Sequence, residues 1–156
     1  MTKISDRQHA VKRTAAGEAA AELAVRVFRL EGRLAAAGDA LAEPFGQTTA
    51  RWRVLAAVER EHLSVAEIAR AWSLARQSVQ RVADLLEREG LVAYAENPRH
   101  ARAKLVALTP SGRRTLSAIQ RAQTAWANDL GARVGVDELR AASDLLELVL
   151  AALPED

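Results

Sequence analysis

Residues 63–108 carry the pattern that most constrains the fold: two short helices joined by a tight turn, then two short apolar strands. Ser64 stands at a helix start and Glu67 follows it three residues later, which is the spacing of a capping box. The sequence therefore predicts a first helix over 65–72. Four of its side chains are expected to be buried: Val65, Ile68, Ala69 and Trp72.

A second helix is predicted over 76–89, after a turn at 73–75. Its apolar residues recur every three to four positions, which is typical of a helix with one buried side. This stripe consists of Val79, Val82, Leu85 and Leu86. The opposite side is polar, and Gly90 stands where a helix end tolerates a left-handed backbone.

Two strands are predicted at 91–95 and 104–108, with a hairpin tip at 97–102. Helix, turn, helix and hairpin in this order indicate a winged helix-turn-helix. The predicted fold class is therefore mainly α with a small β-hairpin wing.

Longer helices are predicted on both sides of this segment. A heptad-like apolar seam covers 15–41, followed by a break at Pro44 and Gly46. Thr48 or Thr49 then caps a helix that runs to about Glu61.

After the hairpin, Thr109 and Pro110 form a strong helix start. Gly131 and Gly135 are expected to bracket the next break, and Asp137 to cap the last helix. The chain should thus contain six helices, with one hairpin between the fourth and the fifth.

The apolar seams of the first and last helices exceed what a small winged domain can cover, so we expect them to form a homodimer interface. A monomeric bundle that buries these seams internally is the alternative. The predicted domains are a flexible arm at 1–14, an N-terminal dimerisation helix and linker at 15–46, the winged helix-turn-helix at 47–114, and C-terminal dimerisation helices at 115–156.

Charge is distributed unevenly. The net charge is only +2, but residues 64–115 hold nine basic and five acidic side chains, while the rest is net negative. Concentrated positive charge favours a phosphate-bearing partner, double-stranded DNA.

Composition argues against several other classes. The 156-residue chain has no cysteine, no apolar run of the roughly 18 residues that a membrane helix needs, and no signal-peptide pattern. Three scattered histidines, without a glycine-rich phosphate loop or a His-Glu-x-x-His motif, offer no basis for an enzyme, a metal site or a cofactor. We expect a protein of the cytoplasm, bound to the bacterial nucleoid, with no membrane partner.

The segment 63–114 resembles the MarR family of bacterial winged-helix transcription regulators. The similarity lies in Leu-Ser-Val-Ala-Glu-Ile-Ala at 63–69, in the residues of 77–82 and 85–92, in the wing tip 97–102, and in Leu-Thr-Pro-Ser-Gly-Arg at 108–113. Leu-Thr-x-x-Gly-Arg after the wing is a specific mark of that family.

The resemblance implies a homodimer on a pseudo-palindromic operator, usually acting as a repressor, which a small aromatic or lipophilic effector releases in many members. It also implies that Arg102 enters the minor groove. Two positions depart from the family pattern. His100 replaces an acidic residue of the wing tip, and Ala75 replaces a serine cap, so Ser73 is a candidate for that capping role.

Candidate DNA-binding residues lie on the second helix, where arginine can pair with guanine and glutamine with adenine, and on the wing. They are Arg76, Gln77, Ser78, Gln80, Arg81, Arg99, Arg102 and Ser64. A ligand pocket, if present, would draw on Phe28, Arg33, Trp52, His62 and Trp126, which can equally be packing residues. A non-sequence-specific architectural DNA-binding protein is the alternative function.

Overall fold

The structure is a computed structural model that describes residues 12–100 and 102–154. It divides into two compact units, one ending at Ala37 and one beginning at Gly38, and each is described by itself. Of the arm predicted over 1–14, residues 1–11 lie outside the described residues. In the described part of the chain, no helix is long and apolar enough to cross a membrane.

The described part of the first unit is a single helix. Helix α1 (Ala15–Ala42) begins where the apolar seam predicted it, and its last five residues belong to the second unit. The Thr14 hydroxyl caps its start by accepting a hydrogen bond from the Gly17 N–H at 3.0 Å. Glu22 and Arg26 form an exposed ion pair one turn apart at 3.0 Å.

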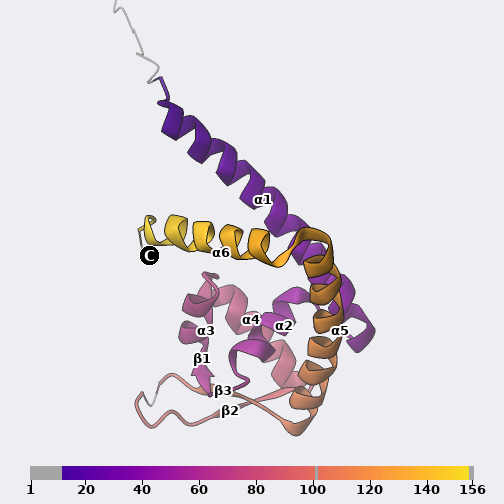
Figure 1. The fold of residues 1–156 in the computed structure, drawn as a ribbon. Helices are drawn as coiled ribbons and strands as arrows, with labels where there is room; N and C mark the ends of the chain where they lie inside the picture. The colour runs from indigo at the N-terminus through magenta and orange to yellow at the C-terminus, as the bar shows by residue number, and fades with distance from the viewer. Residues whose placement is uncertain (1–11, 101, 155–156) are drawn as a thin grey trace, which may run out of the picture. The chain divides into compact units, whose positions relative to one another are not determined.

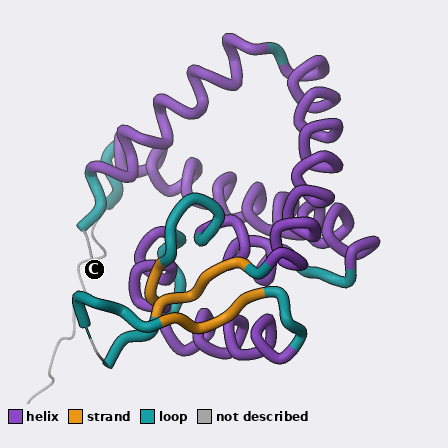
Figure 2. The backbone as a smooth tube through the Cα atoms, turned by 90° about the horizontal axis from the view of Figure 1, so that it is seen from below, coloured by secondary structure: helices purple, strands orange, loops and turns teal. Residues whose placement is uncertain are grey.

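The second unit combines helices with a three-stranded antiparallel sheet in the order β1-β3-β2. Its elements in chain order are a 3-10 turn η1 (Glu43–Phe45), α2 (Thr49–Ala57), β1 (Leu63–Ser64), α3 (Val65–Ala71), α4 (Arg76–Arg88), β2 (Val92–Ala95), β3 (Leu105–Leu108), α5 (Pro110–Val134) and α6 (Val136–Ala151). Figures 1 and 2 show the small sheet beside α3 and α4. The winged helix architecture and the six predicted α-helices are confirmed over the described residues.

The core of this unit forms where α2, α3 and α4 meet the sheet. Val106 is the central position of the sheet, because it pairs with Leu63 on one side and with Tyr94 on the other. The core therefore fixes the wing and both helices of the helix-turn-helix to one another. Its fully buried side chains include Leu55, Ile68, Val79, Leu86, Val106 and Leu116.

Strand β1 is an addition to the predicted hairpin. Leu63 and Ser64 pair with Val106 and Leu105 of β3, so the sheet has three strands where two were predicted. The same pairing explains why α2 is shorter than predicted: it ends at Ala57, not near Glu61, because the chain must turn to reach the sheet edge. The N-cap of α2 is Thr48, whose hydroxyl accepts from the Arg51 N–H.

The predicted burial of Trp72 is wrong. Trp72 follows the last residue of α3, and its side chain is 42% exposed, with the Arg53 guanidinium carbon 5.7 Å from the ring centroid. The helix ends one residue before Trp72, so the apolar stripe does not continue through it. Leu74 packs against the core in the turn.

The capping role considered for Ser73 is also wrong. Ser73 has a left-handed backbone with φ 48°, and it lies in the turn after α3. The N-cap of α4 is Ala75, which makes no side-chain capping bond. The first turn of α4 therefore keeps backbone N–H groups without a capping side chain, as is suited to an anionic partner.

The break between the last two helices lies at one glycine and not between two glycines as predicted. Helix α5 passes through Gly131 and ends at Val134, and Gly135 turns the chain with φ 105°. Asp137 does not cap α6, because the helix has already begun at Val136 and Gly135 occupies the cap position. Asp137 instead adds negative charge to the first turn of α6.

The junction after the wing explains the Leu-Thr-x-x-Gly-Arg pattern. The Thr109 hydroxyl accepts from the Gly112 N–H at 3.0 Å and donates to the Gly90 carbonyl oxygen at 2.7 Å, which ties the start of α5 to the end of α4. Gly112 is buried against the chain at Leu91, where a Cβ atom would overlap the Leu91 carbonyl oxygen. The pattern therefore encodes a cap followed by a close backbone approach.

Gly112→Ala should lower the free energy of unfolding by about 1–3 kcal/mol, because backbone must move to admit the methyl group. Gly131→Ala on the same helix is the matched control, since a methyl group there would meet no atom within 4 Å beyond the backbone of its own helix. That control should be neutral or stabilise by roughly 0.5–1 kcal/mol. Urea unfolding followed by circular dichroism measures both, and equal effects of the two substitutions would contradict the close approach.

Candidate nucleic-acid interface

Helix α4 presents one buried and one exposed side. Val79, Ala83 and Leu86 are buried, whereas Val82 and Leu85 are only half-buried. All five residues predicted from the sequence lie within the first two turns of the helix, so donors of hydrogen bonds are concentrated at its N-terminal half. These exposed residues are Arg76, Gln77, Ser78, Gln80 and Arg81.

A surface hollow of about 420 Å³ lies between α4, the start of α3 and the wing. Its lining brings Arg76 of α4 together with Arg102 and Lys104 of the wing. Three cations around one hollow form an attractive site for phosphate. Sequence reasoning selected Arg76 and Arg102 but missed Lys104, although its place at the base of the wing, two residues after Arg102, was a usable signal.

Arg99 lies in a different environment. It lines a second hollow, of about 350 Å³, together with Glu61, Glu67 and the two histidines His62 and His100. Hydrogen bonds from Ser64 lower the pKa of Glu67, and the charges of Arg70 and then Arg99 lower it further. Arg99 thus shares its hollow with two carboxylates, those of Glu61 and Glu67.

Ser64 is buried and its hydroxyl is engaged. It donates to a Glu67 carboxylate oxygen at 2.7 Å, and it accepts from the Glu67 backbone N–H at 3.3 Å. The Ser64 backbone N–H donates to the same carboxylate, which completes the predicted capping box. Ser64 therefore fixes the start of α3 and has no free hydroxyl to offer.

Gln80 belongs to a compact triangle of polar side chains. Its Nε2 donates to Asp84 Oδ1 and to Tyr94 Oη, both at 2.8 Å. Tyr94 Oη in turn donates to Asp84 Oδ1 at 2.7 Å. Asp84 lies one turn along α4 from Gln80, whereas Tyr94 comes from strand β2, so the triangle connects the exposed side of α4 to the wing.

The triangle shifts the pKa values of both ionisable members. Hydrogen bonds from Tyr94 and then Gln80 lower the pKa of Asp84, so its carboxylate is ionised at neutral pH. Burial raises the pKa of the Tyr94 phenol, and the hydrogen bond to Asp84 raises it further. Sequence reasoning placed Tyr94 only in a strand, and nothing in the sequence pairs it with residues 10 and 14 positions away.

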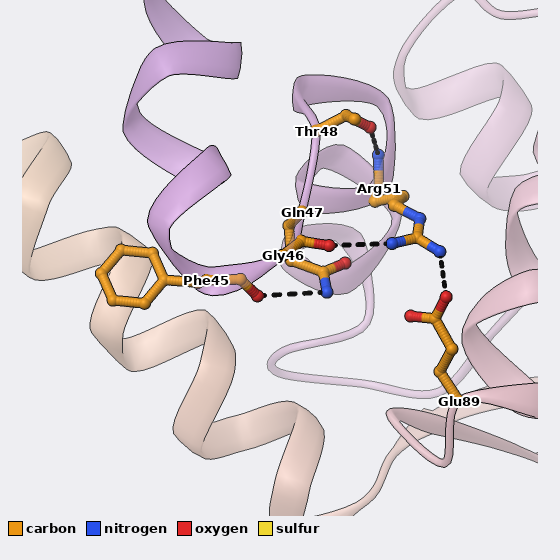
Figure 3. Close-up of polar contacts among 6 residues, drawn as sticks. All are labelled: Phe45, Gly46, Gln47, Thr48, Arg51 and Glu89. Atoms are coloured by element: carbon orange, nitrogen blue, oxygen red, sulfur yellow. Dashed lines mark hydrogen bonds and ion pairs between the residues drawn. The ribbon is translucent and has the colours of Figure 1, made fainter.

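The C-terminal end of α4 is held by a second set of contacts, drawn in Figure 3. The Arg51 guanidinium donates to the Gly46 carbonyl oxygen at 2.9 Å and forms an ion pair with Glu89, the C-cap residue that follows α4. The Arg51 side chain is only 14% exposed. This contact joins the η1–α2 turn to the end of α4.

The ligand-pocket candidates are divided between the two units. Phe28 and Arg33 belong to the first unit, where both side chains are exposed. In the second unit, Trp52 packs against the core and Trp126 is half-buried on α5. His62 lines the hollow around Arg99, on the wing side. The pocket stays a prediction.

Comparisons with known proteins place the chain in a family. Residues 45–103 match the MarR family. An uncharacterised protein of Mycobacterium tuberculosis is 38% identical over 133 residues, which covers 85% of this chain and 93% of the relative. The chain belongs to the MarR family. Family and fold are thus those of DNA-binding winged-helix transcription regulators.

Two named transcription regulators are also similar to this chain. The transcriptional activatory protein BadR of Rhodopseudomonas palustris is 36% identical over 100 residues, 62% of this chain and 57% of BadR. The M. tuberculosis transcriptional regulator MOSR, whose crystal structure is that of a complex with DNA, is 26% identical with a TM-score of 0.69. That match covers 83% of this chain and 94% of MOSR.

Because Tyr94 is the only tyrosine, its ionisation can be followed directly by the ultraviolet absorbance of tyrosinate. In the folded protein, the Tyr94 phenol should ionise with a midpoint well above the ordinary pH of about 10. Asp84→Asn should lower this midpoint toward the ordinary value, because the substitution removes the carboxylate charge beside the phenol. Asp129→Asn, at an exposed ion pair on α5, is the control and should leave the midpoint unchanged. A wild-type midpoint equal to that of the urea-unfolded chain would refute the triangle.

Proposed function

We propose that this MarR-family chain is a homodimeric transcription regulator that binds an inverted-repeat operator with α4 in the major groove and the wing against the adjacent minor groove. The observation that carries the proposal is the joint exposure of Arg76 on α4 and of Arg102 and Lys104 on the wing around one hollow. A cationic hollow flanked by a polar helix face suits a DNA strand whose phosphates pass between helix and wing.

The roles of the side chains follow from their placement. Arg76, Gln77 and Arg81 face outward at the start of α4 and would contact base edges, while Ser78 would contact a phosphate. Arg102 would enter the minor groove, with Arg99 as an auxiliary contact. Ser64 contributes indirectly, by fixing the helix that packs behind α4.

The homodimer is supported by apolar side chains that a single chain leaves exposed. On α1, Phe28 is 75% exposed, and on α6, Leu148 is 71% exposed. Clusters of this kind on helices flanking a winged domain are typical of a subunit interface. Further exposed apolar residues on these two helices and just after α6 are Val25, Leu30, Leu34, Val136, Leu145, Leu150 and Leu153.

Repression by occupying the operator is the proposed mode, with binding to nucleoid DNA in the cytoplasm. The relative BadR is named as an activatory protein, so the sign of regulation depends on where the operator lies relative to a promoter. Release by a small aromatic or lipophilic effector stays a prediction. It would require a compound that lowers operator affinity.

Selection from a random duplex pool should enrich an inverted repeat with half-sites roughly 34 Å apart. On that operator, Arg102→Ala should lower affinity by about tenfold or more and reduce the salt slope by about one, whereas Arg99→Ala should have a smaller effect because carboxylates flank it.

Binding titrations at several salt concentrations measure these changes, with Arg121→Ala on α5 as the charge-matched control. Enrichment of no sequence, together with equal affinity for random DNA, would instead select a non-specific architectural protein. Equal losses for Arg99→Ala and Arg102→Ala would contradict the assignment of the wing tip.

Leu148→Glu should convert the dimer to single chains at micromolar concentration, because a charge cannot be buried unpaired in an apolar interface. Sedimentation equilibrium gives the mass, and circular dichroism checks that the variant stays folded. Ser143→Glu adds the same charge at another exposed position of α6 and should dimerise more strongly than Leu148→Glu. A wild-type protein that sediments as single chains would end the dimer proposal.

A further inference from the structure

The orientation of the Gln80 amide is fixed by the chemistry of its two neighbours. The Asp84 carboxylate can only accept hydrogen bonds when ionised, and the Tyr94 hydroxyl already donates its one proton to that carboxylate. Both groups can therefore only accept from Gln80. The atom that Gln80 turns toward them must be the amide nitrogen, and this is the arrangement in the structure.

The amide oxygen of Gln80 takes no part in the triangle. The nitrogen lies 2.8 Å from Asp84 and 2.8 Å from Tyr94, which places both acceptors on one side of the amide group. Gln80 itself is exposed, on the outer side of α4, and lines the hollow that also holds Arg76 and Arg102. The end that Gln80 offers to a partner is thus an acceptor.

We propose that Asp84 and Tyr94 are positioning residues for sequence recognition, which hold the Gln80 nitrogen inward so that its oxygen meets the exocyclic amino group of adenine or cytosine. This inference rests on the proposed function, since it assumes that α4 enters the major groove. A free glutamine commonly reads adenine with two hydrogen bonds: its oxygen accepts from the N6 amino group and its nitrogen donates to N7. Here the nitrogen is already occupied.

The inference predicts different roles for two groups of the base pair that Gln80 contacts, the exocyclic amino group and purine N7. Removing the exocyclic amino group, adenine N6 or cytosine N4, removes the donor that the oxygen needs. Replacing purine N7 by carbon removes an acceptor that only the amide nitrogen could use. The first change should weaken binding and the second should not.

The experiment uses the full-length protein and the operator selected from the random pool. The pair contacted by Gln80 is identified as the position whose preference Gln80→Ala abolishes. On synthetic operators altered at that pair, deletion of the amino group should weaken wild-type binding by about tenfold, while a 7-deaza purine should leave it unchanged.

Tyr94→Phe keeps the packed ring but removes the hydroxyl, and Asp84→Ala removes the carboxylate at a half-buried position of the helix. In either variant the amide can rotate and its nitrogen can donate to purine N7, so a 7-deaza purine, which should leave wild-type binding unchanged, should weaken binding of the variant by about threefold or more. Thr124→Val is the matched control, since the Thr124 hydroxyl donates to the carbonyl of Gln120 in its own helix, away from the triangle. It should keep the wild-type pattern.

The outcomes separate the two proposals. If the wild type enriches no operator, the proposed function fails and this inference fails with it. If an operator is enriched but the 7-deaza purine weakens wild-type binding, or leaves the binding of both Tyr94→Phe and Asp84→Ala unchanged, only the positioning role is overturned. Melting temperatures near that of the wild type confirm that the variants are folded.

Discussion

The burial of one side of α4 is the constraint on which the rest of the structure depends. Val79, Ala83 and Leu86 are almost completely buried, and each large apolar side chain contributes roughly 1.5–3 kcal/mol when it leaves water. Exposing this stripe to water would cost more free energy than any surface contact of the helix could contribute. Which residues face outward is therefore decided by packing, and Arg76 and Arg81 are exposed because Val79 and Ala83 are not.

Packing fixes the side of α4 that is exposed, and polar contacts refine its attachment. Tyr94 attaches the middle of the helix to the wing, and Arg51 attaches its end to the η1–α2 turn. Contacts between partly exposed charged groups contribute little to the free energy of folding, commonly below about 1 kcal/mol. These contacts matter for geometry, because each one fixes the orientation of a side chain that the apolar core leaves undetermined.

The sequence was sufficient wherever a local pattern determines structure. Apolar periodicity placed α4, and the Ser64 capping box placed the start of α3, because both depend on residues within two turns. It was insufficient where a partner is remote: strand β1 exists only because Leu63 meets Val106, and Tyr94 meets Gln80 only because the sheet folds back on α4. The candidate DNA-binding residues were chosen by side-chain type and by their place on the second helix and the wing, and the family resemblance singled out Arg102. The carboxylates that share a hollow with Arg99 come into view only in the structure.

The placement of acidic groups explains how a chain with a net charge of only +2 can still present a cationic surface. Two acidic residues along α4 and at its end have internal partners: Asp84 accepts from Tyr94 and Gln80, and Glu89 pairs with Arg51. Glu67 is similarly engaged by Ser64, beside Arg99. Among the described residues that line the hollow between α4 and the wing, the three cations of Arg76, Arg102 and Lys104 face one carboxylate, that of Glu87, so the charge balance there is positive. The electrostatic field at this hollow thus depends on which charged side chains have partners within the fold. The net charge of the chain does not reveal this.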